Sequence, residues 1–111
     1  MKLGGPAIHP GEILSDELAE IGVTASDLAR AIGVPINRVT QILKGQRGIT
    51  ADTALRLGQW FGSGPKIWMD LQKDYELRTA EAALGDALKT IPHRRNAEPI
   101  RDQALSGPVG P

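Results

Sequence analysis

Apolar residues recur at helical spacing in several short stretches, and each stretch is bounded by residues that begin or end helices. One predicted helix spans 25–32 and is followed by Gly33, which suits a left-handed turn at a helix C-terminus. The next spans 35–44 and begins at Pro35, a residue that a first helical turn tolerates. Two amphipathic helices joined by a short glycine-containing turn predict a helix-turn-helix, with 35–44 as its recognition helix. The apolar positions of the pair are Leu28, Ala29, Ile32, Val39, Ile42 and Leu43.

The same periodicity predicts three further helices, over about 10–21, over 51–61 and over about 65–89, the last with Gly85 as a weak point. No stretch alternates between apolar and polar residues as a half-buried strand does. We therefore expect an all-α domain of five helices in which the fifth helix is extended. The side chains expected on the apolar faces are Leu14, Leu18, Ile21, Ala54, Leu57, Phe61, Ile67, Trp68, Leu71 and Tyr75.

With 111 residues the chain is expected to hold one domain with a modest core. Residues 1–8, broken by glycine and proline, predict a short N-terminal arm. Residues 9–84 predict the helix-turn-helix domain, for DNA binding and dimerisation. Residues 85–111 contain the end of the last helix and a stretch with proline and glycine but few large apolar groups, which predicts a flexible tail.

The charged residues are balanced in number but not in position. Lys and Arg together count 13, as do Asp and Glu, so the net charge gives no sign of a nucleic-acid partner. Residues 35–56, however, hold four basic side chains against Asp52 alone, whereas residues 12–27 hold five acidic side chains and no basic one. This separation suggests two faces for two partners. Two ordinary solvated faces are the alternative.

Several kinds of chemistry find no support in residue content or spacing. The chain has no cysteine, which rules out disulfides and thiolate metal sites. Its two histidines, His9 and His93, lie near prolines in segments expected outside the core, and no metal-ligand, phosphate-loop or nucleophile–base pattern is present. We therefore expect no enzyme, no metal and no cofactor. Without a signal peptide or a run approaching ~20 apolar residues, we expect a soluble cytoplasmic protein with no membrane partner.

The predicted recognition helix carries side chains suited to DNA. Such a helix enters the major groove by its N-terminal end, where amide, guanidinium and aliphatic groups meet base edges. The end of the helix, the following loop and the start of the preceding helix are placed for phosphate contacts. The base-facing candidates are Ile36, Asn37, Arg38, Thr40 and Gln41, and the phosphate-facing candidates are Thr24, Ser26, Lys44, Gln46 and Arg47.

These segments carry a family pattern. The chain resembles the HigA-type antitoxins of bacterial type II toxin–antitoxin modules, a branch of the phage-repressor-like (Xre) helix-turn-helix family. The resemblance covers about residues 8–84, and two positions depart from it: Pro35 stands where Ser or Thr often caps the recognition helix, and Ala25 where a longer polar residue often reaches a phosphate. The matching segments are IHPGEIL at 8–14, LARAIGVP at 28–35, NRVTQILKGQRGITADTALRL at 37–57 and WFGSGPKIWMDLQKDYEL at 60–77.

The resemblance implies a five-helix fold and a two-fold homodimer that binds double-stranded operator DNA and represses its own operon. It also implies a toxin partner, usually a small, basic, ribosome-dependent mRNA endonuclease of the RelE-like fold. A basic toxin would fit the acidic first helix. The toxin-facing candidates are Glu12, Asp16, Glu17 and Glu20, and the dimer-interface candidates are Trp68, Leu71 and Tyr75, which share one side of the fifth helix.

Alternatives remain at each of these points. A free-standing repressor without a toxin, and a protein-interaction module that has lost DNA binding, both fit the same helices. Arg38 and Lys44 are alternatively solvated surface charges, and the acidic residues alternatively serve solubility alone. Core packing is the favoured alternative for the aromatic side chains Trp60, Trp68 and Tyr75.

Overall fold

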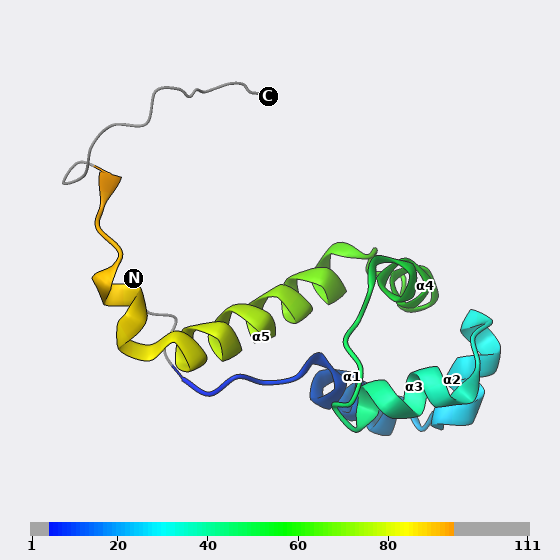
Figure 1. The fold of residues 1–111 in the computed structure, drawn as a ribbon. Helices are drawn as coiled ribbons and strands as arrows, with labels where there is room; N and C mark the ends of the chain where they lie inside the picture. Colours follow the sequence, from blue (N-terminus) through cyan, green and yellow to red (C-terminus); the bar gives the residue numbers. More distant parts are fainter. Residues whose placement is uncertain (1–4, 95–111) are drawn as a thin grey trace. The chain divides into compact units, whose positions relative to one another are not determined.

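A computed structural model of the chain describes residues 5–94, which form five α-helices and a short 3₁₀-helix (Figure 1). No β-strand occurs within this described range, so the predicted all-α, five-helix fold is confirmed. The elements are α1 (Pro10–Ile21), α2 (Ala25–Ile32), α3 (Ile36–Leu43), α4 (Ala51–Phe61), α5 (Lys66–Leu84) and the 3₁₀-helix η1 (Gly85–Thr90).

Two helices, the third and the fifth, differ from their predicted bounds. The fifth helix ends at Leu84 and not near Lys89, because Gly85 takes a positive φ of 53° and the chain continues as η1. Pro35 precedes α3 as its N-cap, with extended backbone, and its side chain offers no capping hydrogen bond. The predicted tail lies mostly outside the described residues.

Side chains at the helix starts explain why the helices begin where they do. Thr24 and Asp27 form a reciprocal capping box at α2, and the Thr50 hydroxyl accepts the backbone N–H of Thr53 at the start of α4. At α1 the cap is His9, whose Nδ1 accepts the backbone N–H of Gly11 at 2.9 Å. The ring of His9 is also buried, with its centroid 4.8 Å from that of Tyr75. The expectation that His9 lies outside the core is therefore wrong.

The core lies between the helices of the helix-turn-helix and their neighbours. Helix α3 packs against both α1 and α2, and α2 also packs against α4. Two of the expected apolar-face positions are wrong, because Ile21 and Ile67 are 50% and 51% exposed at the end of α1 and the beginning of α5. The buried cluster consists of Leu14, Leu18, Leu28, Ala29, Ile32, Val39, Ile42, Ile49, Ala54, Leu57 and Trp68, with Phe61 and Leu71 partly buried against it.

One close approach fixes the distance between α1 and the recognition helix. A Cβ atom added at Gly11 would overlap the backbone carbonyl oxygen of Ile42 in the last turn of α3. Because backbone cannot move aside as a flexible side chain does, α3 reaches this position only where α1 has glycine. The sequence element that starts α1 thus also sets the depth at which α3 packs.

The chain divides into two compact units between Ala80 and Glu81. Helices α1–α4 and most of α5 belong to the first unit, and the described part of the second contains the end of α5 and η1. Among the helices described, none is long and apolar enough to cross a membrane.

Candidate nucleic-acid interface

Helix α3 has one buried side and one open side. Val39 and Ile42 are buried against α1 and α2, which fixes the rotation of the helix about its axis. On the open side, Asn37 is exposed and Ile36 is half exposed, at the N-terminal end where base contacts are predicted. The segment therefore has the amphipathic character that a recognition helix needs, with amide and aliphatic groups facing outward.

Candidates for base reading and phosphate contact are joined by a hydrogen bond. The Nε of Arg47 donates to Oε1 of Gln41 at 2.9 Å, so a side chain of the loop after α3 contacts the partly exposed side of the helix. The backbone N–H of Gln46 donates to the carbonyl oxygen of Gln41 at 2.8 Å and closes the end of the helix, where Gly45 takes a positive φ of 75°. The side chain of Arg47 and the backbone of Gln46 are therefore held beside Gln41.

Of the remaining candidates, all but Thr40 lie at helix ends. Lys44 is exposed at the C-cap of α3, and Ser26 is exposed in the first turn of α2. The Thr24 hydroxyl accepts the backbone N–H of Asp27 at 3.1 Å, and its own hydrogen remains a donor. Thr40 is partly exposed, and its hydroxyl donates to the carbonyl oxygen of Asn37 at 3.3 Å.

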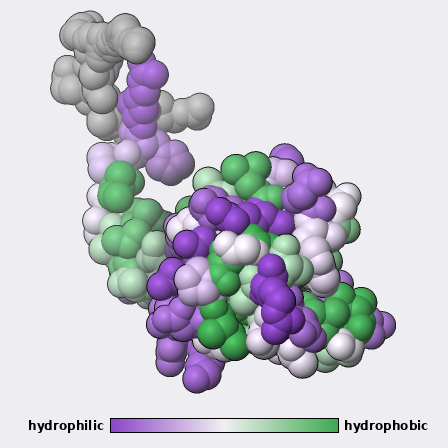
Figure 2. Space-filling model, turned by 90° about the vertical axis from the view of Figure 1, so that its right-hand side faces the viewer, coloured by the Kyte–Doolittle hydropathy of each residue, from purple (hydrophilic) through white to green (hydrophobic). Residues whose placement is uncertain are grey.

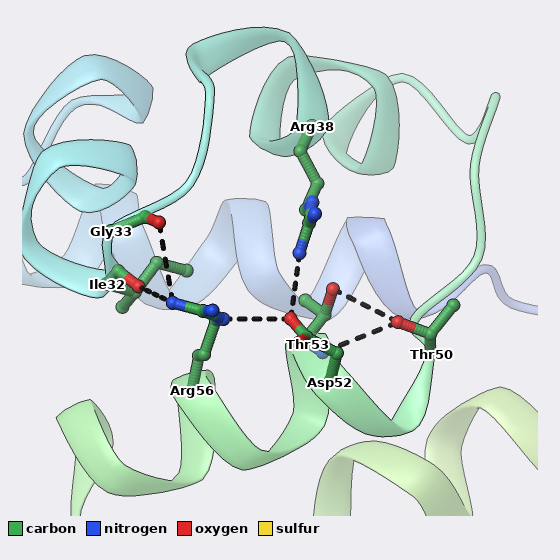
Figure 3. Close-up of polar contacts among 7 residues, drawn as sticks. All are labelled: Ile32, Gly33, Arg38, Thr50, Asp52, Thr53 and Arg56. Carbon is green, nitrogen blue, oxygen red and sulfur yellow. Dashed lines mark hydrogen bonds and ion pairs between the residues drawn. The ribbon is translucent and has the colours of Figure 1, made fainter.

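Arg38 differs from its neighbours in α3 because its guanidinium turns toward α4 (Figure 3). Its Nη1 donates to Oδ1 of Asp52 at 2.8 Å, and 29% of the side chain is exposed. The Nε of Arg56 donates to the same carboxylate oxygen at 2.8 Å, and its Nη1 donates to the carbonyl oxygen of Ile32 at 2.8 Å and that of Gly33 at 3.4 Å. These contacts join α3, α4 and the turn after α2 through charged groups. The expectation that Arg38 shares the outward face of Asn37 and Gln41 does not hold in this structure.

The pKa of Asp52 is lowered, most strongly by the hydrogen bond from Arg56. Desolvation opposes this with a smaller effect, and the hydrogen bond from Arg38 lowers the pKa further by less again. The carboxylate is therefore ionised at neutral pH, as its two guanidinium partners require. The pair Asp52 and Arg56, four residues apart on one helix, was recognisable from the sequence. Its link to Arg38 was not, because it depends on how α3 and α4 pack.

Gln72 of α5 is a second position that sequence reasoning missed. The side chain is 6% exposed, and its Oε1 accepts the backbone N–H of Ile49 at 2.7 Å while its Nε2 donates to Oε2 of Glu76 at 2.7 Å. The loop that carries Arg47 is thus tied to α5 by a buried neutral side chain. A polar residue within the apolar pattern of the fifth helix is a weak signal, and nothing in the sequence pointed to Ile49 as its partner.

The four acidic candidates for a toxin contact, Glu12, Asp16, Glu17 and Glu20, are all exposed on α1. The dimer-interface candidates are different. Trp68 is 4% exposed in the core, with its ring centroid 5.3 Å from that of Phe61, as the favoured alternative of core packing predicts for this dimer-interface candidate. Leu71 and Tyr75 are partly buried, against the core cluster and against His9.

Apolar side chains also reach the surface between α2 and α4. A pocket of about 340 Å³ is lined there by Ala31, Ile32, Leu55, Arg56, Gln59 and Trp60. Figure 2 views the side of the molecule that carries α2 and α4, where apolar and hydrophilic residues lie interspersed. Within the described range no group of His, Asp and Glu side chains is arranged to hold a metal ion.

Comparison with known proteins places this geometry in a family. The model of a family described as helix-turn-helix matches residues 14–64. Virulence-associated protein I of Dichelobacter nodosus is 51% identical over 77 residues, which cover 68% of this chain and 71% of that protein.

Two solved structures share the fold along nearly their whole length. An addiction module antidote protein of a HigA family from Coxiella burnetii is 43% identical, with a TM-score of 0.77 over 80% of this chain and 100% of that one. Antitoxin HigA of Pseudomonas aeruginosa, solved with the higBA promoter, is 46% identical, with a TM-score of 0.74 over 78% of this chain and 96% of that one.

The matched segment includes the whole helix-turn-helix and α4. The helix-turn-helix antitoxins and repressors are a non-enzymatic family, which agrees with the expectation from residue content that this protein is not an enzyme. In sequence and in fold, the chain is a member of the HigA family of helix-turn-helix antitoxins.

Proposed function

We propose that this protein is an antitoxin that binds operator DNA as a dimer, represses the operon from which it is expressed and neutralises a RelE-like mRNA endonuclease. The observation that carries the proposal is α3, a helix with a fully packed inner stripe and an exposed polar outer side. The Pseudomonas relative solved with its promoter supports the DNA partner. The toxin and the dimer rest on the family resemblance and on the charge and apolar distribution.

In the proposed complex the N-terminal half of α3 enters the major groove. Asn37 and Gln41, one helical turn apart, offer amides to adenine, while Ile36 and Thr40 offer methyl groups and a hydroxyl. Lys44, Gln46 and Arg47, together with Thr24 and Ser26 at the start of α2, contact phosphates on either side. Replacing Asn37 or Gln41 with Ala is expected to cost about 1–3 kcal/mol at its cognate base pair.

A two-fold dimer would place two such helices ~34 Å apart, one turn of the duplex. Since Trp68 is buried, we propose that dimer contacts within 65–84 come from apolar groups that α5 leaves exposed, such as Ile67, Met69 and Leu77. Leu71 and Tyr75 contribute only through their uncovered parts. Sedimentation at micromolar concentration tests the dimer directly.

The acidic side chains of α1 are proposed to receive the toxin. They lie on a different helix from the cationic loop after α3, so toxin and DNA need not compete for the same residues. Reversing Asp16, Glu17 and Glu20 to Lys is expected to slow association with a basic toxin, most strongly at low salt, and to leave DNA binding intact. Unchanged association rates in this triple variant would show that the acidic side chains of α1 do not receive the toxin.

The proposal is tested by two experiments on the full chain. Binding to the promoter segment upstream of its own gene, at ~50 mM and ~200 mM salt, should show the steep salt dependence of phosphate contacts. Co-expression with the product of the adjacent gene should give a stable complex and rescue growth from its toxicity. DNA binding without a co-purifying partner would favour a free-standing repressor, a role suggested by the Escherichia coli relative described as an HTH-type transcriptional regulator.

A further inference from the structure

The cation of Arg38 is held by a different helix from the one that carries it. Arg38 stands in the first turn of α3, directly after the exposed Asn37, yet its Nη1 donates to Oδ1 of Asp52 in α4 at 2.8 Å (Figure 3). The guanidinium points at α4, as the close-up shows, and not away from the domain. A positively charged side chain of the helix proposed to enter DNA is thus paired with an acidic side chain of the same protein.

Asp52 is fixed in place from its other side. Arg56 donates through Nε to the same Oδ1 at 2.8 Å and through Nη1 to the carbonyl oxygen of Ile32 at 2.8 Å. Arg56 is therefore anchored at the end of α2 while it holds the carboxylate of Asp52. Because its partner is anchored, Asp52 presents Arg38 with an acceptor at a set position and not with a freely rotating carboxylate.

We propose that Asp52 is a positioning residue that withholds Arg38 from DNA phosphates and so lowers the affinity of the protein for duplexes of any sequence. The proposal rests on DNA binding by α3 as set out above. Because Arg38 turns toward α4 and away from the exposed Asn37, we expect a released guanidinium to contact a phosphate beside the groove, and such contacts carry no sequence information. With Arg38 held back, discrimination is left to neutral side chains such as Asn37 and Gln41.

The size of the effect follows from counterion release. Each phosphate contact adds ~0.9 to the slope of log K against log salt concentration. One additional contact from a released Arg38 therefore steepens that slope by about one unit and, at ~0.1 M salt, tightens binding to a duplex by about eightfold.

The test uses the full chain and a short fluorescein-labelled duplex of mixed sequence, with anisotropy measured at several salt concentrations. Asp52→Asn should bind this duplex about eightfold more tightly than the wild type and with the steeper slope. Asp52→Glu, which keeps the charge, should behave as the wild type. The matched control is Asp70→Asn, which removes the same charge from a half-exposed α5 aspartate that accepts from Lys66 at 2.7 Å, and which should change binding by less than about twofold.

A second background isolates the role of Arg38. In an Arg38→Gln chain, the additional change Asp52→Asn should no longer tighten binding, because no cation remains to be released. Equal tightening with and without Arg38 would overturn the inference and reduce Asp52 to a general charge effect. Tightening by Asp52→Asn no greater than that by Asp70→Asn would overturn it as well.

Two measurements distinguish a failure of this inference from misfolding of the variant and from failure of the proposed function. Circular dichroism establishes that each variant keeps its helices, and Asp52→Ser, with a residue common at helix N-termini, replaces Asp52→Asn if the latter does not fold. A wild-type chain that binds neither its own promoter nor the mixed duplex, at any salt concentration, refutes the proposed function. A wild-type chain that binds both, while Asp52→Asn is unchanged, refutes only the role of Asp52.

Discussion

The two ends of the recognition helix are held by different kinds of contact. Before its N-terminus, the turn after α2 is held by Arg56, which reaches the carbonyl oxygen of Ile32 from the exposed side of α4 and pairs with Asp52. At its C-terminus, the helix and the following loop are held by buried contacts, with Gly11 against Ile42 and Gln72 bonded to Ile49.

The difference shows how one small helix is both positioned and adjustable. Buried contacts between neutral groups depend on shape and on complete hydrogen bonding, and are little affected by salt or pH. Exposed ionic contacts respond to both and contribute less. The C-terminal end of α3 is thus the fixed end, and its N-terminal end, which is proposed to read bases, is held through charges that DNA can influence.

Gly11→Ala should have the largest effect. Helix propensity alone would make this variant more stable than the wild type by up to about 1 kcal/mol. The overlap with the carbonyl oxygen of Ile42 should instead destabilise the fold by about 3 kcal/mol, since α1 and α3 must separate. Urea denaturation decides the sign, with Ser15→Ala on the exposed side of α1 as a control expected within about 0.5 kcal/mol. A stabilised Gly11→Ala variant would show that the C-terminal end of α3 is not fixed.

Gln72→Leu should follow, with a loss of about 2 kcal/mol, because the buried N–H of Ile49 loses its acceptor. Most of this loss should be the same at low and high salt, since the buried hydrogen bond to Ile49 joins neutral groups and only the bond from Gln72 to Glu76 involves a charge. Gln59→Leu, at an exposed glutamine of α4, controls for the change of residue type and should shift the free energy of unfolding by less than about 0.5 kcal/mol. Equal effects of the two variants would contradict a buried anchor at Gln72.

Arg56→Gln should cost about 1 kcal/mol, through the lost hydrogen bonds to the carbonyl oxygens after α2. In contrast to Gln72→Leu, this cost should decrease in ~1 M salt, which screens the pairing with Asp52. Arg30→Gln offers a comparison, because Arg30 only pairs with Asp27 on the surface, at 3.4 Å. If Arg56→Gln were as salt-independent as Gln72→Leu, the two ends of α3 would not differ in kind.

The pH dependence should be the smallest effect. The pKa of Asp52 is lowered in the folded protein, first by Arg56 and then by Arg38, so its ionisation stabilises the fold above the ordinary aspartate pKa of 3.8. This stabilisation is lost as the pH falls through the lowered value. Asp52→Asn should therefore flatten the acid limb of a stability–pH curve. An unchanged acid limb in Asp52→Asn would contradict the pairing.

Local rules account for most of the helices and for the outward side of α3. The caps at Thr24 and Thr50 and the apolar stripes around Leu28 and Ile42 were readable because each depends on neighbours within a few residues. Gly85 was identified as a weak point, but the end of the fifth helix there was not, because a helical propensity alone does not say whether a glycine interrupts or continues a helix.

Most of the parts that could not be predicted depend on contacts between distant residues. His9 packs on Tyr75 although its segment was expected outside the core, and Trp68 fills the core although it was also a candidate for the dimer interface. Arg38 was expected to point outward from its place in α3, and its turn toward Asp52 follows from the packing of two helices. Helical spacing shows which residues share a side of one helix, but not which other element covers that side.

Gln72 has a consequence for the spontaneous opening of the protein. The backbone N–H of Ile49 lies in a loop, where amide protons ordinarily exchange with solvent within a short time. Since its acceptor is a buried side chain of α5, this proton can exchange only when the loop separates from that helix. Deuterium uptake at Ile49 would therefore report how often α5 releases the segment that follows the recognition helix.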